Sequence, residues 1–236
     1  MKIILWRKRK MKLTENTVNV LKNFSTINPN LLVKEGSTIT TMSAMKNILA
    51  KANVDEEFNQ QFAIYDLNEF LSSTSLFKTP IIDFKDQYLT IKEETSKGTK
   101  LKYFYSDPSV VTSPSKMITM PSEDVCFEIT SDTLNQLKKA ASVIQAPDLV
   151  LKKENGQTTM TVSDKKNDTA NNYSIEVNTT SDNSKSFEFY YKVENLKLLP
   201  GTYSVSVSSK NISHFKSKTN NVEYWIALEP ESKYEG

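Results

Sequence analysis

Apolar residues recur at the helical spacing of three and four positions in four stretches of the chain. These stretches are residues 14–25, 66–77, 131–145 and 193–199. In the first, Lys22 lies opposite the apolar stripe; in the third, Lys139 lies opposite the stripe and Lys138 flanks it. Pro147 and Pro200 stop the last two stretches. The pattern predicts four helices, each of which covers other elements with one apolar face.

Between these stretches, apolar and polar residues alternate with the period of two that is typical of half-buried strands. The predicted strands are residues 61–65, 87–93, 101–106, 124–129, 158–163, 173–179, 203–209 and 222–228. Many short strands with few helices between them favour antiparallel sheets that carry helices on one face. We therefore expect an α+β fold.

The two halves of the chain resemble each other at two offsets. A shift of 116 positions places residues 17–22 on residues 133–138, and a shift of 126 places residues 65–70 on residues 191–196. Each half then contains a strand, a helix, strands, a second helix and strands, which indicates a duplicated fold. The expected division is a basic extension or upstream start at 1–10, a first domain at 11–112, a connection at 113–121 and a second domain at 122–236.

The charge of the chain is unevenly distributed. Its formal net charge is +2, but the first ten residues hold five basic and no acidic side chains, so the remainder carries 25 basic and 28 acidic residues. DNA-binding domains are usually basic overall, so contact with DNA would need a small basic surface on an acidic body. The tail is either a nucleic-acid-binding arm or sequence upstream of a true start at Met11. We favour the second interpretation, because well-patterned sequence begins at Met11.

Residues that carry catalysis are scarce in this sequence. His214 has no nucleophile that the sequence identifies as its partner, and Cys126 lies in an alternating strand, as a small core residue would. Five glycines leave little material for a phosphate-binding loop, and no Cys/His cluster offers a metal site. No apolar run approaches the ~20 residues that span a bilayer. We expect no enzyme, no cofactor, no metal and no membrane association, and a cytoplasmic location.

Several short motifs resemble one known family. They are Met-Lys-Leu at residues 11–13, Leu-Lys-Asn-Phe-x-x-Ile-Asn at 21–28, Ala-Ile-Tyr-Asp-Leu-Asn-x-Phe-Leu at 63–71, Pro-Gly-x-Tyr at 200–203 and Ala-Leu-Glu at 227–229. In this order and at similar spacing, they resemble the sliding clamps of T-even-type bacteriophages. The resemblance implies the DNA-clamp fold, with two similar domains that each have an antiparallel sheet and two helices on one face.

The resemblance also implies a function. Such a clamp is a homotrimeric ring that encircles duplex DNA without regard to sequence and tethers the DNA polymerase, with helices lining the hole. Its other partners would be the clamp-loader ATPase and late transcription factors, and it would act in the cytoplasm of the infected bacterial host. The competing hypothesis is a β-rich phage structural or virion protein that assembles through sheet edges. Lysines behind the apolar stripes of helices in both halves argue against that alternative.

The DNA-facing side chains implied by the matched helices are all lysines. They are Lys12, Lys22, Lys139 and Lys197, and Lys138 joins them on local grounds. The alternative is that each is a solvated helix lysine. Glu15 and Ser142 stand where the family can have basic residues, so the inner surface is expected to be less basic than in relatives.

Two further surfaces follow from the resemblance. Subunits would join through strand edges that hold Leu101, Tyr103 and Tyr105 on one side and Tyr173, Ile175 and Val177 on the other. Apolar tails of partners would dock in a groove lined by Met117, Ile118, Met120, Ala227, Leu228 and Pro230. Methionine suits several partners because its flexible side chain can repack. Alternatively, these groove residues only seal the junction between the domains.

Overall fold

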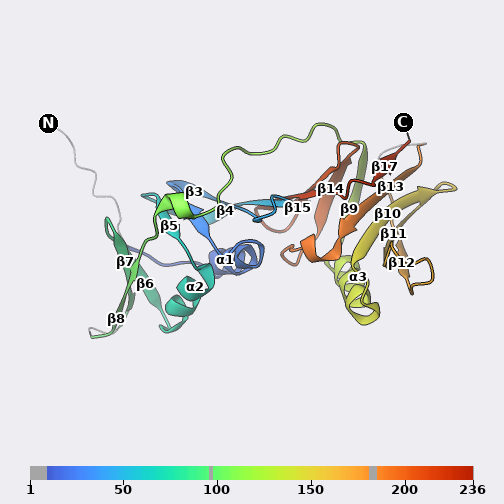
Figure 1. Ribbon diagram of the computed structural model, residues 1–236. Coiled ribbons are helices and arrows are strands. Elements are labelled where there is room, and N and C mark those ends of the chain that lie inside the picture. The colour runs from blue at the N-terminus through green and yellow to red at the C-terminus, as the bar shows by residue number, and fades with distance from the viewer. Residues whose placement is uncertain (1–9, 96–97, 181–184, 236) are drawn as a thin grey trace. The chain divides into compact units, whose positions relative to one another are not determined.

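The computed structural model describes residues 10–95, 98–180 and 185–235, which form two compact units (Figure 1). The first unit ends at Ser115 and the second begins at Lys116, except that residues 47–49 group with the second unit. Of the predicted basic extension, only Lys10 lies among the described residues; it pairs with Asp83 in a short strand.

The first unit contains a four-stranded antiparallel sheet in the order β1-β6-β7-β8, and β2 pairs with β5. β3 lies beside β4, and the helices α1 and α2 pack on each other. The elements are β1 (Lys10–Met11), α1 (Glu15–Ile27), β2 (Leu31–Val33), β3 (Gly36–Met42), β4 (Ile48–Phe58), β5 (Phe62–Ile64), α2 (Leu67–Ser75), β6 (Pro80–Phe84), β7 (Tyr88–Glu93), β8 (Lys100–Phe104) and the 3-10 turn η1 (Pro108–Val110).

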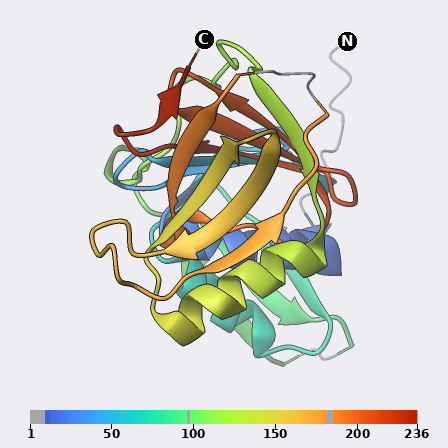
Figure 2. The same cartoon turned by 90° about the vertical axis from the view of Figure 1, so that its right-hand side faces the viewer.

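The second unit contains one sheet in the order β12-β11-β10-β13-β17 and a second sheet formed by β9, β14, β15 and β16. The helix α3 packs against β11 and β12, and Figure 2 shows it beside the end of that sheet. The elements are β9 (Val125–Ile129), α3 (Ser131–Ile144), β10 (Asp148–Glu154), β11 (Gln157–Ser163), β12 (Tyr173–Glu176), β13 (Phe187–Lys192), the 3-10 turn η2 (Val193–Asn195), β14 (Tyr203–Ser208), β15 (Ile212–Ser217), β16 (Val222–Ala227) and β17 (Lys233–Tyr234).

The duplication is visible in the topology. The strand before the first helix pairs with the sixth strand of its unit in both cases, giving the orders β1-β6-β7-β8 and β9-β14-β15-β16. The first helices also begin alike: the Thr14 hydroxyl accepts the Thr17 N–H and the Thr130 hydroxyl accepts the Thr133 N–H, each at 3.2 Å. These side chains satisfy backbone donors that a helix start leaves unpaired. The predicted α+β class with two similar domains is confirmed.

Each unit has its own apolar core. In the first, Phe24 of α1 and Leu67 of α2 are fully buried, and Phe62 lies 5.3 Å from Phe84 between ring centroids. In the second, Tyr203 and Phe215 are fully buried and meet edge to face. Burying one large apolar side chain stabilises a fold by roughly 1.5–3 kcal/mol, so these residues hold the sheets and helices together.

The prediction of a helix at residues 193–199 is wrong. The structure has only the 3-10 turn η2 there, after which Leu196 takes a non-helical backbone conformation. Lys192 precedes the turn and provides no side-chain cap, and the buried Leu196 and Leu198 are two positions apart, as in extended chain. The second unit therefore has one helix of more than a single turn among its described residues, and not the two expected.

Some strands were not predicted from the sequence. They are β1, β2, β3, β4, β6, β10, β13, β15 and β17. In β4 the alternation is concealed because the acidic Glu56 occupies a buried position, where it accepts hydrogen bonds from the Thr14 N–H and the Thr17 hydroxyl. A carboxylate at the start of α1 is also favourable for the helix dipole. Glu56 thus helps to fix the helix that carries Lys22.

Candidate nucleic-acid interface and assembly surfaces

The helix α1 places one of the predicted lysines on its exposed side. Leu21 and Phe24 are buried, whereas Lys22 between them is exposed. Glu15 lies in the first turn of the same helix, so α1 carries one acidic and one basic side chain. The geometry leaves Lys22 available to a phosphate, but the helix as a whole is electrically neutral.

The helix α3 carries two of the predicted lysines in different environments. Lys139 is exposed, while Lys138 is half-buried beside the apolar stripe of Leu134, Leu137 and Ala141. Burial lowers the pKa of Lys138. Lys139 is therefore the better candidate for contact with an external anion.

The other two predicted lysines lie outside the helices. Lys12 precedes α1 and forms an ion pair with Glu94, and Lys197 is half-buried just after η2. Within α1, α2 and α3 the charged residues are Glu15, Lys22, Glu69, Asp132, Lys138 and Lys139. Three basic and three acidic side chains balance, so the helices themselves do not form a strongly basic surface.

The strands β8 and β12 are both edges of their sheets. Leu101 and Tyr103 lie in β8, with Tyr105 just beyond it, and Tyr173 and Ile175 lie in β12. Val177, which was also predicted for this edge, follows β12, and its N–H donates to the Thr158 carbonyl at 3.0 Å. The structure thus places each predicted interface set along one edge strand of its sheet. Such an edge offers free backbone donors and acceptors to another chain.

Two tyrosines anchor the β8 edge to the first unit. The Tyr103 hydroxyl donates to the Asp66 carbonyl at 3.3 Å, and its ring meets Phe70 edge to face. Tyr105 lies 5.3 Å from Phe62 between ring centroids, and its hydroxyl accepts from the Gln60 amide at 3.3 Å. Burial raises the pKa of each phenol to about 12, so both are neutral over the physiological range.

The predicted groove residues differ in exposure. Met117 and Ile118 are 43% and 37% exposed, and Leu228 is only 6% exposed. Met120 and Ala227 are half-buried, and Pro230 is exposed. All six groove residues belong to the second unit. Leu228 is therefore buried, whereas the connection offers accessible apolar side chains.

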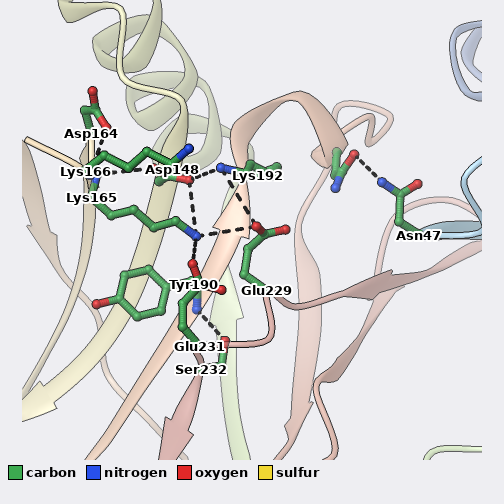
Figure 3. Close-up of polar contacts among 11 residues, drawn as sticks. Asn47, Asp148, Asp164, Lys165, Lys166, Tyr190, Lys192, Glu229, Glu231 and Ser232 are labelled. Atoms are coloured by element: carbon green, nitrogen blue, oxygen red, sulfur yellow. Dashed lines mark hydrogen bonds and ion pairs between the residues drawn. The ribbon is translucent and has the colours of Figure 1, made fainter.

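A charged cluster that the sequence did not reveal lies beside the end of the closing strand (Figure 3). Asp148 is 1% exposed, and its Oδ1 accepts from the Lys192 Nζ at 2.6 Å while its Oδ2 accepts from the Lys165 N–H at 3.2 Å. The Lys165 ammonium pairs with Glu229 at 3.4 Å and also with Glu231. Burial works to lower the pKa of Lys165, but these carboxylates outweigh it and raise that pKa.

The cluster holds the segment after β16 against β13. The Glu229 N–H donates to the Tyr190 carbonyl at 2.8 Å, and the Tyr190 N–H donates to the Ser232 hydroxyl at 3.0 Å (Figure 3). The five charged side chains come from four places in the sequence, so no local motif could have identified them. The cluster fixes the backbone that carries the predicted groove residue Pro230.

Other kinds of site find little support. No group of three or more His, Cys, Asp or Glu side chains among the described residues is arranged to hold a metal ion. In the same part of the chain, no helix is both long and apolar enough to cross a membrane. His214 stacks on Trp225 with 4.6 Å between ring centroids and lies 3.1 Å from the Glu223 carboxylate. Its burial lowers its pKa.

Comparison with protein families matches both halves of the chain. Residues 12–113 match the family described as DNA polymerase processivity factor, and residues 126–230 match the family described as gp45 sliding clamp, C terminal. The sliding clamp of Vibrio phage KVP40 is 31% identical over 93% of this chain and 99% of the relative, and that of Escherichia phage RB69 is 30% identical over 95% and 100%. The chain belongs to the sliding-clamp family of T4-like phages.

The clamp fold extends beyond phages. Proliferating cellular nuclear antigen (PCNA) from Entamoeba histolytica has a TM-score of 0.65 at 14% identity, covering 94% of this chain and 98% of that one. The structure of A. fulgidus PCNA with the C-terminal region of FEN-1 bound has a TM-score of 0.68 at 11% identity, covering 95% and 99%. At these identities the likeness shows the fold alone. It confirms the predicted DNA-clamp architecture.

Family membership gives this chain its function. It is a sliding clamp, a processivity factor that encircles duplex DNA and tethers the DNA polymerase. Sliding clamps are processivity factors rather than enzymes. The alternative of a phage structural protein is not favoured, because both halves match clamp families.

Proposed function

We propose that three copies of this sliding clamp close into a ring through the β8 edge of one copy and the β12 edge of the next. A closed head-to-tail ring needs two different surfaces on each subunit. Two edge strands with different sequences, one in each unit, meet that requirement. This pair of edges is the main support for the ring. The number of three subunits is taken from the resemblance to phage clamps. The proposed domains are residues 11–112 and 122–236, joined by residues 113–121.

The ring would hold DNA chiefly by topology. Lys22 and Lys139 are exposed on helices of the two units, and we assign them, with Lys12, Lys138 and Lys197, to phosphate contacts on the inner surface. Phosphate contacts carry no sequence information and permit sliding. Because the charges within α1, α2 and α3 balance, each contact would be weak, and the closed ring would prevent dissociation.

Partner tails would dock in the groove named above, on Met117, Ile118, Met120, Ala227, Leu228 and Pro230. Two of its exposed members lie in the connection, and the A. fulgidus PCNA structure has the C-terminal region of another protein, FEN-1, bound to that clamp. The users of the groove would be the DNA polymerase, the clamp-loader ATPase and late transcription factors. The clamp would act in the cytoplasm of the infected bacterium.

Native mass spectrometry tests the ring, with a trimer expected and a stable monomer at high concentration as the contrary outcome. For the groove, Ile118→Asp should reduce polymerase stimulation at least several-fold while the trimer persists, because a carboxylate cannot enter an apolar contact without a partner. Lys116→Asp, at a neighbouring exposed position, is the matched control. Full stimulation by the Ile118 variant would place the docking site elsewhere.

A further inference from the structure

The two edge strands each present one apolar and one polar side. In β8, Tyr103 lies opposite the buried Leu89 and faces α2, whereas Lys102 and Phe104 point to the other side and are exposed. In β12, Ile175 lies opposite the buried Met160 in the sheet against which α3 packs. Alternation then puts Ser174 and Glu176 on the far side of that sheet, and both are exposed.

The Lys102 ammonium is held beside two aromatic rings. It lies 3.9 Å from the ring centroid of Tyr88 and 4.4 Å from that of Phe104, within the range of cation–π attraction. No carboxylate among the described residues lies within ion-pair distance of it. In the same described part of the chain, Glu176 forms no ion pair either. The two edges therefore carry opposite charges that form no ion pair within the described part of the chain.

Building on the ring proposed above, we propose that β8 of one copy pairs antiparallel with β12 of the next, with Lys102 opposite Glu176. An antiparallel pair continues the pattern of both sheets, in which all described pairs are antiparallel. The register places Leu101, Tyr103 and Tyr105 opposite Val177, Ile175 and Tyr173. Apolar side chains then meet on the helix-covered face, and the charges meet on the other face.

Neighbouring registers fit less well. A slip of one residue pairs the helix-facing residues of one strand with residues of the other strand that point to the opposite face. A slip of two residues in one direction places Lys100 opposite Glu176 and leaves Tyr105 facing Asn171. In the other direction, Phe104 faces Glu176 and Lys102 faces Asn178. Only the proposed register joins all three apolar pairs and the charge pair.

A pocket at the end of β8 adds an independent feature. It has a volume of about 430 Å³, and Phe62, Tyr105, Asp86 and Asp107 are among the residues that line it. In the proposed register, Tyr173 of the neighbouring copy lies opposite Tyr105, at this pocket. Tyr173 is 40% exposed in the subunit, so its ring is available to enter the pocket.

Exchange of the two charges tests the register. Lys102→Glu alone and Glu176→Lys alone each bring like charges together at all interfaces, and each should weaken trimer assembly roughly tenfold or more. The double variant Lys102→Glu with Glu176→Lys restores opposite charges and should recover most of the assembly. The measurement is the trimer fraction across a dilution series by native mass spectrometry, with melting temperatures checking that each variant is folded.

Lys100→Glu combined with Glu176→Lys is the matched control, because Lys100 lies on the same face two positions away. Recovery in the Lys102 pair only would support the register. Recovery in the Lys100 pair only, or in neither pair, would overturn it. If the unaltered chain forms trimers and stimulates polymerase but neither double variant recovers assembly, only the proposed register is wrong. If the unaltered chain never forms trimers, the proposed ring itself is wrong.

Discussion

The two units follow one topology but differ in the element that comes after β5 in the first unit and after β13 in the second. There the first unit forms the nine-residue helix α2, and the second forms only the 3-10 turn η2. Both begin with the same backbone contact: the N–H of Leu67 donates to the Pro29 carbonyl at 2.8 Å, and that of Val193 donates to the Pro147 carbonyl at 2.9 Å. α2 and η2 therefore start at equivalent positions, and they differ in whether the helix continues beyond its first turn.

The residue that precedes each element explains much of this difference. Asp66 accepts the backbone N–H groups of Asn68 and Glu69 at 2.9 and 3.0 Å, so its side chain satisfies donors at the start of α2. Lys192 holds the equivalent position in the second unit and has no acceptor to offer. Its ammonium instead pairs with the buried Asp148. A duplicated fold can thus keep its sheets while one element differs, and the presence or absence of a capping side chain contributes to that difference.

The largest expected effect is on assembly. Ile175→Pro in the edge strand β12 should leave a folded monomer, because proline removes a backbone donor and cannot extend a ladder. Lys233→Pro, on the opposite edge of the same sheet, should keep the trimer. Sedimentation of the two variants checks this difference between edges. A trimeric Ile175 variant would show that β12 is not an assembly edge.

The next effect concerns the charged cluster of the second unit. Asp148→Ala leaves Lys165 and Lys192 without their shared buried carboxylate and should cost roughly 3–5 kcal/mol of unfolding free energy. In the first unit, Asn30 is the equivalent residue, and its amide donates to the Tyr65 carbonyl at 2.7 Å. Asn30→Ala should cost only about 1 kcal/mol. Urea unfolding measures both, and equal losses would contradict the distinction between the units.

A smaller effect is expected at the helix cap. Asp66→Ala removes the acceptor at the start of α2 and should cost about 1 kcal/mol of unfolding free energy, with reduced hydrogen-exchange protection in α2. Lys192→Asp should not create a helix in the second unit, because it would place a second carboxylate beside Asp148. Unchanged protection of α2 in the Asp66 variant would mean that packing alone maintains that helix.

The smallest effect is expected from the lysines on the helices. Replacing Lys22 and Lys139 together by Glu should slow loading onto DNA a few-fold and leave the trimer intact, because only the proposed inner surface changes charge. Lys166→Glu, in an exposed loop, is the control and should have no effect. Loading rates at low salt measure this. A similar loss in both variants would count against an inner-surface role for the helices.

The helices α1 and α3 were predictable because an apolar stripe, a threonine cap and a polar face agree along each of them. The edges β8 and β12 also coincide with the strands expected from the family resemblance. The strand β4 was not predictable, because Glu56 occupies a buried position that only its contacts with α1 explain. The Asp148 cluster was hidden for a related reason: its members lie far apart in the sequence and meet only in the folded sheet.

Topological retention on circular DNA distinguishes a ring that encircles DNA from a protein that binds its surface. The clamp is loaded by its loader onto nicked circular DNA, free protein is washed away at high salt, and half of the sample is cut once with a restriction enzyme. Bound clamp is then measured over time on both forms. Long retention on circles with rapid loss from the cut DNA is the predicted result, because a ring leaves only over a free end. Equal retention on the two forms would show that the chain does not encircle DNA.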